Sequence, residues 1–305
     1  MERTLLGALS LSLAASIWGG MFVASKYVLE YIPPFTLMVI RYFIGSIVLF
    51  SLLKWTQKDN RAKTKKDWFL LLWIGFIGYL VTISFQFIGV ELSNAHTGSL
   101  LTATTPIFLV LFARIILKEK ITARKAASLL LAITGVTIVI EWDTGMGDYL
   151  TGSIILVMAA ISWALLSVYV KIAAKKFSSL EITGYGIFFG MLMTSPLMVW
   201  ELQSTILPLP NGSIIVGIVY LGVVSTAGGF YFWNKGMELM EAGVGSLFYF
   251  FQPLVGSLFG WLLLGESLSL NFFIGFAIIM LSIIVVTVKP FRKQRTRYLQ
   301  NKKAQ

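Results

Sequence analysis

Polar residues recur at helical spacing inside two long apolar runs of this chain. In one run Thr102 and Thr105 are three residues apart, and in a later run Tyr249 and Gln252 repeat that spacing. Residues three or four apart share one face of a helix, and polar side chains within an apolar helix normally face a bundle interior or a water-filled cavity. This pattern favours a polar path through the bundle interior. The residues predicted to line its path are Trp18, Tyr79, Gln86, Thr102, Thr105, Trp163, Thr226, Trp233, Tyr249 and Gln252.

A purely structural role is the alternative for several of these positions. Small and hydroxylated residues also let helices approach closely, and a Ser or Thr hydroxyl can bond to the carbonyl one turn earlier. Packing is therefore favoured for Gly98 and Gly245, whereas a large polar group such as that of Gln252 needs a partner and favours a cavity. For Trp18 and Trp163, which lie well inside their runs, both stacking on a solute and plain helix packing are open.

Prolines and cations mark particular places along this path. Pro106 and Pro253 occupy matching positions in their runs, and proline frees backbone carbonyls, so we expect a kink or hinge there. Lys26, Arg41 and His96 are expected at the outer mouth. The two cations can snorkel to lipid headgroups or attract an anionic group such as a carboxylate, and His96 can be simply solvated or titrate near neutral pH.

Residues that catalytic and metal sites need are scarce. The chain has no cysteine and one histidine, so it offers neither a thiol nucleophile nor a multi-histidine metal site. Every acidic residue falls at or beyond the end of an apolar run, which leaves no buried carboxylate pair, and no Walker A sequence is present. We therefore expect no enzymatic activity, no metal and no cofactor.

The elements that position these residues must be membrane-spanning helices. Hydrophobic residues make up 57% of the 305-residue chain, charged residues only 13%, and mean hydropathy is +0.81. A soluble domain carries about 25% charged residues, and a helix needs about 20 apolar residues to cross the hydrocarbon. Ten such runs occur, near 5–26, 35–54, 68–88, 95–117, 122–140, 152–171, 180–200, 212–233, 243–264 and 270–288. The sequence predicts an all-α, polytopic membrane protein with ten transmembrane helices.

Two short connections between these runs carry a glutamate followed by a hydroxylated residue. Glu119 precedes Thr122, and Glu266 precedes Ser269. Because carboxylates and hydroxyls both favour helix N-termini, we expect each glutamate to cap the turn into the next helix.

Basic residues indicate the orientation in the membrane. If the N-terminus is inside, all of the 25 lysines and arginines except Lys26 and Arg41 fall on the inner side, where short loops retain positive charge. We therefore expect an inner or plasma membrane location with both termini cytoplasmic, and residues 289–305 form a basic cytoplasmic tail. The net charge of +11 is attributed to this membrane surface rather than to nucleic acid.

The chain contains the same unit twice. The matches begin at Gly89, Glu91 and Leu92, which recur with equal spacing as Gly236, Glu238 and Leu239. Further matches run through the two prolines to the two glutamates, and Trp18 and Trp163 occupy equivalent places in the opening helices. A unit of five crossings makes the second copy enter the membrane from the opposite side. This gives an inverted 5+5 repeat, an arrangement whose binding site lies at the repeat interface.

Together these features resemble the paired EamA domains of the drug/metabolite transporter superfamily. The resemblance rests on the two five-helix units, on Trp18 and Trp163, on small residues leading to Pro106 or Pro253, and on the glutamate after each fourth helix. It covers residues 1–141 as a first repeat and 152–288 as a second. It implies ten helices, a central cavity lined by the first four helices of each half, and fifth and tenth helices at the periphery.

The resemblance also implies a secondary transporter that exports small metabolites, such as amino acids or drug-like amphipathic solutes, by alternating access. Solute uptake or facilitated exchange is the alternative within transport, and a non-transporting membrane sensor is the alternative outside it. The expected partners are a small-molecule substrate and the lipid bilayer, with a homodimer also compatible with the sequence and no nucleic acid.

Overall fold

The computed structural model describes residues 2–56, 62–92, 101–102, 104–139, 149–205, 207, 211–264 and 270–287. Every regular element within these ranges is a helix. The first half contains α1 (Glu2–Leu29), α2 (Pro34–Thr56), α3 (Lys65–Ile74), η1 (Gly75–Thr82), α4 (Ile83–Leu92), α6 (Thr105–Ile115) and α7 (Ala123–Val139). The second half contains α8 (Tyr149–Ala173), α9 (Ser179–Leu202), α10 (Gly212–Val219), η2 (Tyr220–Gly229), α11 (Phe230–Leu239), α12 (Ala242–Gly245), η3 (Ser246–Phe250), α13 (Phe251–Leu264) and α14 (Leu270–Thr287).

The length and apolar character of these helices confirm the all-helical, polytopic class. Six are long and apolar enough to cross a membrane: Glu2–Met21, Pro34–Thr56, Lys65–Gly89, Thr151–Ala173, Ser179–Leu202 and Gly212–Leu239. Two shorter apolar helices, Thr105–Ile115 and Phe273–Val286, also coincide with predicted spans. The count of ten crossings remains a prediction from the sequence.

One helix in each half widens into a π-helical stretch at its centre. The stretch η1 joins α3 to α4, and η2 joins α10 to α11, at matching places in the two repeats. The Thr82 hydroxyl donates to the Ile77 carbonyl at 2.7 Å, and the Thr226 hydroxyl donates to the Leu221 carbonyl at 2.7 Å. Each bond reaches back five residues, the spacing of a π-turn. Such turns are rare and occur often at functional sites.

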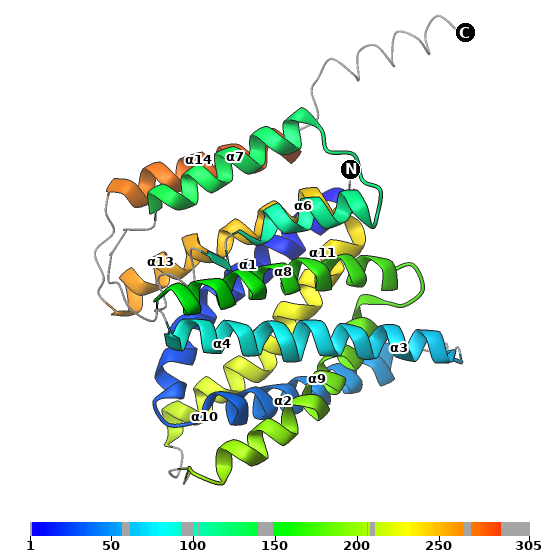
Figure 1. Ribbon diagram of the computed structural model, residues 1–305, viewed down its shortest axis with the longest axis vertical. Helices are drawn as coiled ribbons and strands as arrows, with labels where there is room; N and C mark the ends of the chain where they lie inside the picture. Colours follow the sequence, from blue (N-terminus) through cyan, green and yellow to red (C-terminus); the bar gives the residue numbers. More distant parts are fainter. Residues whose placement is uncertain are drawn as a thin grey trace, which may run out of the picture.

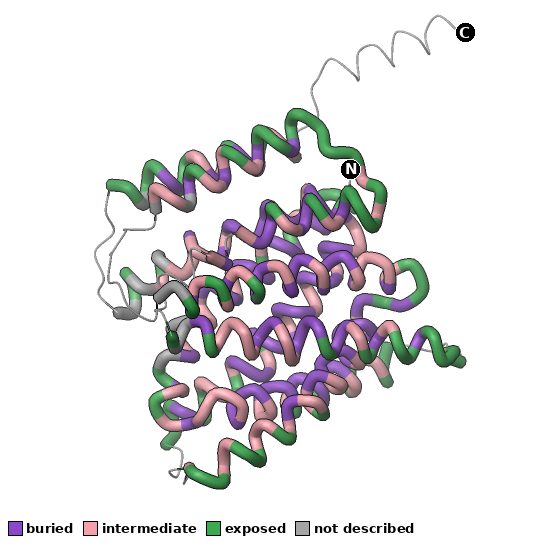
Figure 2. The backbone as a smooth tube through the Cα atoms, viewed as in Figure 1, coloured by how far each residue is buried: buried purple, intermediate pink, exposed green. Residues whose placement is uncertain are grey.

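The two halves interlock rather than forming separate bundles. Helix α1 packs against α11 and α13, α2 packs against α9 and η2, and α4 packs against α8. Figure 1 shows the helices lying side by side, with the start of α1 and the end of α14 at the same end of the molecule. Buried residues concentrate where helices of the two halves cross (Figure 2). Elements distant in sequence therefore share one core.

Helices α7 and α14 form a pair at the edge of the molecule. They pack mainly on each other along one side of the molecule (Figure 1), and both also contact η3. Gly135 permits this approach, since a Cβ there would lie 2.9 Å from the Gly275 carbonyl oxygen. Most of the pair is exposed or half-buried (Figure 2). The fifth and last predicted spans thus lie at the periphery and contribute only a few residues, Ala132, Ile279 and Ile283, to the core.

Candidate substrate-binding site

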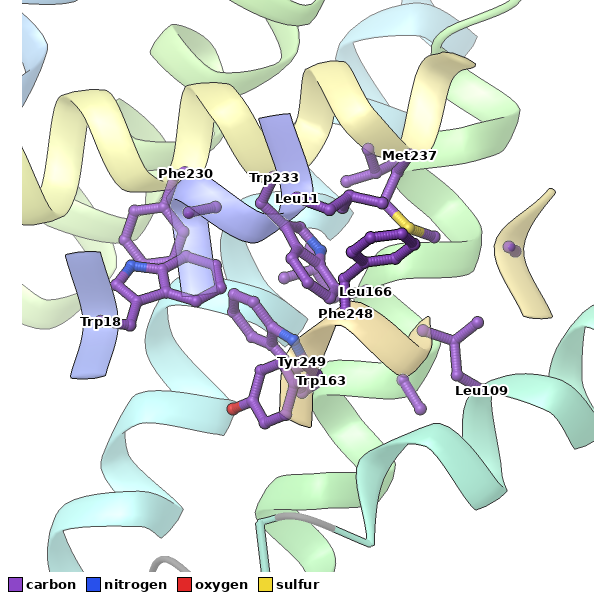
Figure 3. Close-up of a cluster of buried hydrophobic side chains, with 14 of the residues drawn as sticks. Leu11, Trp18, Leu109, Trp163, Leu166, Phe230, Trp233, Met237, Phe248 and Tyr249 are labelled. Carbon is purple, nitrogen blue, oxygen red and sulfur yellow. The ribbon is translucent and has the colours of Figure 1, made fainter. Parts of the chain in front are cut away.

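Several aromatic residues predicted to line the path meet in one buried cluster, shown in part in Figure 3. We call the following residues the aromatic cluster: Trp18, Tyr79, Trp163, Phe230, Trp233 and Tyr249. The three tryptophans and Tyr249 are all mutual neighbours, with every pair of ring centroids separated by 5.2 to 6.4 Å. Trp18 and Trp163, the equivalent residues of the two repeats, make the closest of these pairs, edge to face at 81°. The cluster therefore lies where the two halves meet.

Different helices supply these rings, and local geometry fixes each one. The Trp18 indole Nε1 donates to the Ser225 carbonyl at 3.2 Å, and the Trp233 indole donates to the Ser167 hydroxyl at 3.2 Å. Gly229, the last residue of η2, leaves space for Trp18, because a Cβ there would lie 2.6 Å from the indole nitrogen. The π-helical stretch of the second half thus positions the tryptophan of the first half.

Four of the predicted path residues carry buried polar atoms without a partner. Within the described residues, no hydrogen bond reaches the Tyr79 hydroxyl, the Thr105 hydroxyl, the Trp163 indole nitrogen or the Gln252 amide oxygen. An unpaired buried polar atom costs about 1–3 kcal/mol, and native proteins contain few of them. Four other described side chains, Ser46, Trp73, Ser84 and Ser128, also carry such atoms. The four path residues supply donors and acceptors in the core that a polar ligand can satisfy.

The remaining path residues occupy varied surroundings. Thr102 is buried and Gln86 is half-buried on α4. Pro106 lies in the first turn of α6, and Pro253 lies in the first turn of α13, directly after the 3₁₀ stretch η3. Pro106 therefore starts a helical segment, where proline removes no helical hydrogen bond, whereas Pro253 follows η3 without a break and has no N–H to offer the carbonyls of that turn. The change of helix type before Pro253 is compatible with the predicted kink.

Residues predicted for the outer mouth fall in different places. Arg41 is 3% exposed and contacts η2, so it lies in the core and does not reach the headgroups. The Arg41 side chain therefore does not snorkel to the lipid headgroups, because close contact between α2 and η2 encloses it. Lys26 belongs to α1, although its side chain is outside the described part of the chain. His96 also lies outside the described residues.

Glu119 caps a helix in the other half, rather than the next helix as predicted. Its carboxylate accepts hydrogen bonds from the backbone amides of Ala242 and Gly243, at 2.8 and 3.1 Å. Lys125 forms ion pairs with Glu119 at 3.4 Å and with Glu241 at 2.7 Å. We call this group of residues the α12 cap. The adjoining turn into α7 is capped by the Thr122 hydroxyl, as its place three residues after Glu119 predicts, and this hydroxyl accepts from the Lys125 amide at 3.2 Å.

Sequence reasoning missed some residues that complete the site. Phe230 joins the aromatic cluster, with ring centroids 4.8 Å from Tyr79 and 5.3 Å from Trp18. Its place directly after the small residues Gly228 and Gly229 was a usable signal, because small residues mark close helix approach. The role of Ser225 had no such signal, since it depends on a backbone carbonyl and on which helix packs beside it.

Comparisons with known proteins identify the family. The model of the EamA-like transporter family matches residues 5–141 and again 150–288. An uncharacterized transporter of Bacillus subtilis (strain 168), YetK, is 30% identical over 293 residues, covering 95% of this chain and 88% of the relative. A second from the same organism, YoaV, is 26% identical and covers 96% of this chain and 100% of the relative.

The fold is also similar to a known crystal structure. That structure aligns with a TM-score of 0.78 at 21% sequence identity, and the alignment covers 94% of this chain and 96% of the other. At this identity the likeness concerns the fold alone. The two family matches cover nearly the whole chain and coincide with the predicted repeats. The chain therefore belongs to the EamA-like transporter family.

Proposed function

We propose that this protein is a secondary transporter that exports small metabolites, such as amino acids or drug-like amphipathic solutes, by alternating access. The observation that carries the proposal is the aromatic cluster, to which both repeats contribute equivalent tryptophans. Large rings bury much apolar area and stack on planar groups, while the unpartnered atoms of Tyr79, Trp163 and Gln252 offer hydrogen bonds. The core is thus suited to an amphipathic solute.

Alternating access requires contacts between the halves that can break at one end and form at the other. The α12 cap joins the first half to the second at one end of the bundle. At the other end, the Glu201 carboxylate on α9 accepts from the Thr36 amide at 2.7 Å and from the Thr36 hydroxyl at 2.8 Å, at the start of α2. Transporters of inverted repeats work by rocking one part against another around a central site. We assign these two joints to opposite gates.

The orientation belongs to the same proposal. The end carrying the α12 cap also carries Lys63 and Lys176, which pair with Glu181 and Asp67 at 3.0 Å each. Because short loops retain their positive charge inside, we assign this end and both termini to the cytoplasm. The membrane is then the inner or plasma membrane of the cell.

A flux assay tests the function. The purified protein is reconstituted into proteoliposomes, and movement of labelled amino acids and aromatic cations is measured under imposed solute, proton and sodium gradients. Trp163→Ala and Gln252→Ala are expected to lower flux severalfold while membrane insertion stays intact. Trp200→Ala is the matched control, because that tryptophan is 67% exposed and should change nothing.

The outcomes separate the alternatives. Flux out of the cytoplasmic face supports export, whereas net inward or strictly exchange-dependent flux supports an uptake or exchange carrier. Binding of a solute without any flux would support a membrane sensor and refute transport. Normal flux in both core variants would remove the aromatic cluster from the path.

A further inference from the structure

A charged side chain lies buried beside the aromatic cluster and has no counter-charge. The Arg41 guanidinium donates from Nε to the Thr226 hydroxyl at 2.8 Å and from Nη2 to the Ser225 hydroxyl at 3.5 Å. A third contact runs from Nη2 to the Met21 sulfur at 3.5 Å. All three acceptors are neutral. Among the described residues Arg41 forms no ion pair, although its side chain is only 3% exposed.

This arrangement is costly unless an anion completes it. A cation removed from water loses several kcal/mol of hydration, which neutral hydroxyls repay only in part. Charges within membrane proteins normally pair with an opposite charge or lie on a substrate pathway. A guanidinium carries five N–H donors in a planar fork that fits a carboxylate with two parallel hydrogen bonds. No acceptor for Nη1 is found among the described residues, and the two contacts of Nη2 are long, at 3.5 Å each, so a carboxylate could bind across Nη1 and Nη2 by displacing them.

The packing around Arg41 shows that its burial is built into the fold. One turn further along α2, a Cβ at Gly45 would lie 2.9 Å from the Thr226 side chain. On the facing stretch η2, a Cβ at Gly222 would lie 2.7 Å from the side chain of Ile44. These two glycines bring α2 against η2. The hydroxyl of Thr226 is in turn oriented by its own bond to the Leu221 carbonyl, made possible by the π-turn.

The guanidinium and the aromatic cluster share a neighbour. Ser225 accepts from Arg41 through its hydroxyl and from the Trp18 indole through its carbonyl. Tyr42, next to Arg41, donates its hydroxyl to the Tyr79 carbonyl at 2.8 Å. The guanidinium and the aromatic cluster are therefore linked through one shared residue, Ser225, and through the neighbour of Arg41, Tyr42.

We propose that Arg41 binds the carboxylate of the transported solute, and that the substrate class is organic anions or zwitterions carrying an aromatic or apolar group. That the bound solute is transported rests on the proposed function, whereas binding at Arg41 is argued from the contacts of Arg41 alone. The rival explanation is a structural arginine that only ties α2 to η2. That role would not depend on the charge of a ligand.

A pair of probes of equal shape separates the two explanations. The dissociation constants of 3-phenylpropionate and 3-phenylpropionamide are measured on purified full-length protein in phosphatidylcholine nanodiscs at neutral pH. A hydrogen bond to a charged group is worth about 1.5–3 kcal/mol, so the wild type should bind the carboxylate at least about tenfold more tightly than the amide. In Arg41→Met the two constants should agree within about twofold. Arg114→Met, which alters an exposed arginine, should keep the full preference.

Further outcomes complete the test. If Arg41→Met does not fold, Arg41→Lys decides, because a point charge without the planar fork should retain a preference reduced by about threefold or more. No preference in the wild type, or an unchanged preference in Arg41→Met or Arg41→Lys, overturns the inference. Loss of the wild-type preference when phosphatidylglycerol is added would assign the guanidinium to a lipid phosphate and also overturn it.

The assay measures binding without flux, so its failure is distinguishable from failure of the proposed function. A protein with the expected carboxylate preference and no flux refutes transport and leaves the Arg41 site standing. A protein that shows flux but no preference for the carboxylate refutes the Arg41 site and leaves the transport proposal standing.

Discussion

Replacing Gly229 by alanine tests whether the end of η2 positions the aromatic cluster. The added Cβ would lie 2.6 Å from the Trp18 indole nitrogen and 3.3 Å from two carbons of the same ring. Non-bonded carbon atoms prefer about 3.5–4.0 Å, so the ring must withdraw by about 1 Å. That movement breaks the hydrogen bond from the indole to the Ser225 carbonyl and disturbs the edge-to-face contact with Trp163.

The change in the free energy of unfolding for Gly229→Ala is the sum of opposing effects. Alanine is favoured over glycine by about 1 kcal/mol inside a helix, whereas overpacking a core costs about 1–3 kcal/mol and the lost hydrogen bond about 1 kcal/mol. Gly228→Ala isolates the packing effect. It lies one residue earlier in the same π-helical stretch, and its Cβ would meet only the Val223 carbonyl oxygen, at an ordinary 3.6 Å. The gain in helix propensity from alanine is then the same in both variants, so it cancels when their stabilities are compared.

We therefore expect Gly229→Ala to melt below Gly228→Ala when purified protein is heated in detergent. Disturbed stacking, worth about 0.5–1.5 kcal/mol per aromatic pair, should also weaken solute binding by about twofold to tenfold. Tryptophan emission reports the ring movement directly. Equal melting temperatures, emission spectra and flux in the two variants would refute the packing of Trp18 against Gly229.

Two other perturbations address the gates and the hinge. Glu119→Gln keeps the shape of the capping side chain but removes its charge, so loss of the charge-assisted bonds to Ala242 and Gly243 should cost about 1–2 kcal/mol of folding stability. It should also alter the balance between the two open states, measured as a changed ratio of solute affinities from the two faces. An unchanged melting temperature would show that the α12 cap contributes nothing to stability. Pro253→Ala should not lower the melting temperature, because the alanine amide can donate to a carbonyl of the preceding 3₁₀ turn. It should slow the flux if this proline sets the kink, and full flux in this variant would exclude the hinge.

Much of the membrane architecture could be predicted from the sequence because it depends on local properties of the chain. The predicted runs 35–54 and 180–200 correspond to α2 (Pro34–Thr56) and α9 (Ser179–Leu202), since apolar length alone sets where a membrane helix can form. The repeat followed from the spacing of identical residues, and the family followed from the resemblance of these motifs to paired EamA domains; the family model matches twice, over 5–141 and 150–288. Helical periodicity also placed Tyr249 and Gln252 on one face before any contact was known.

Only the tertiary structure decided which distant residues meet. The sequence placed Glu119 beside its own next helix, whereas the fold brings it to the amides of Ala242 and Gly243. It placed Arg41 at the outer mouth, either snorkelling to lipid headgroups or attracting an anion, whereas crossing of α2 and η2 encloses it beside Thr226. In a membrane helix nearly every face is apolar, so hydrophobicity does not reveal which face is buried against protein and which meets lipid. That choice is made by close approach of helices from the two halves, a property of pairs of segments far apart along the chain.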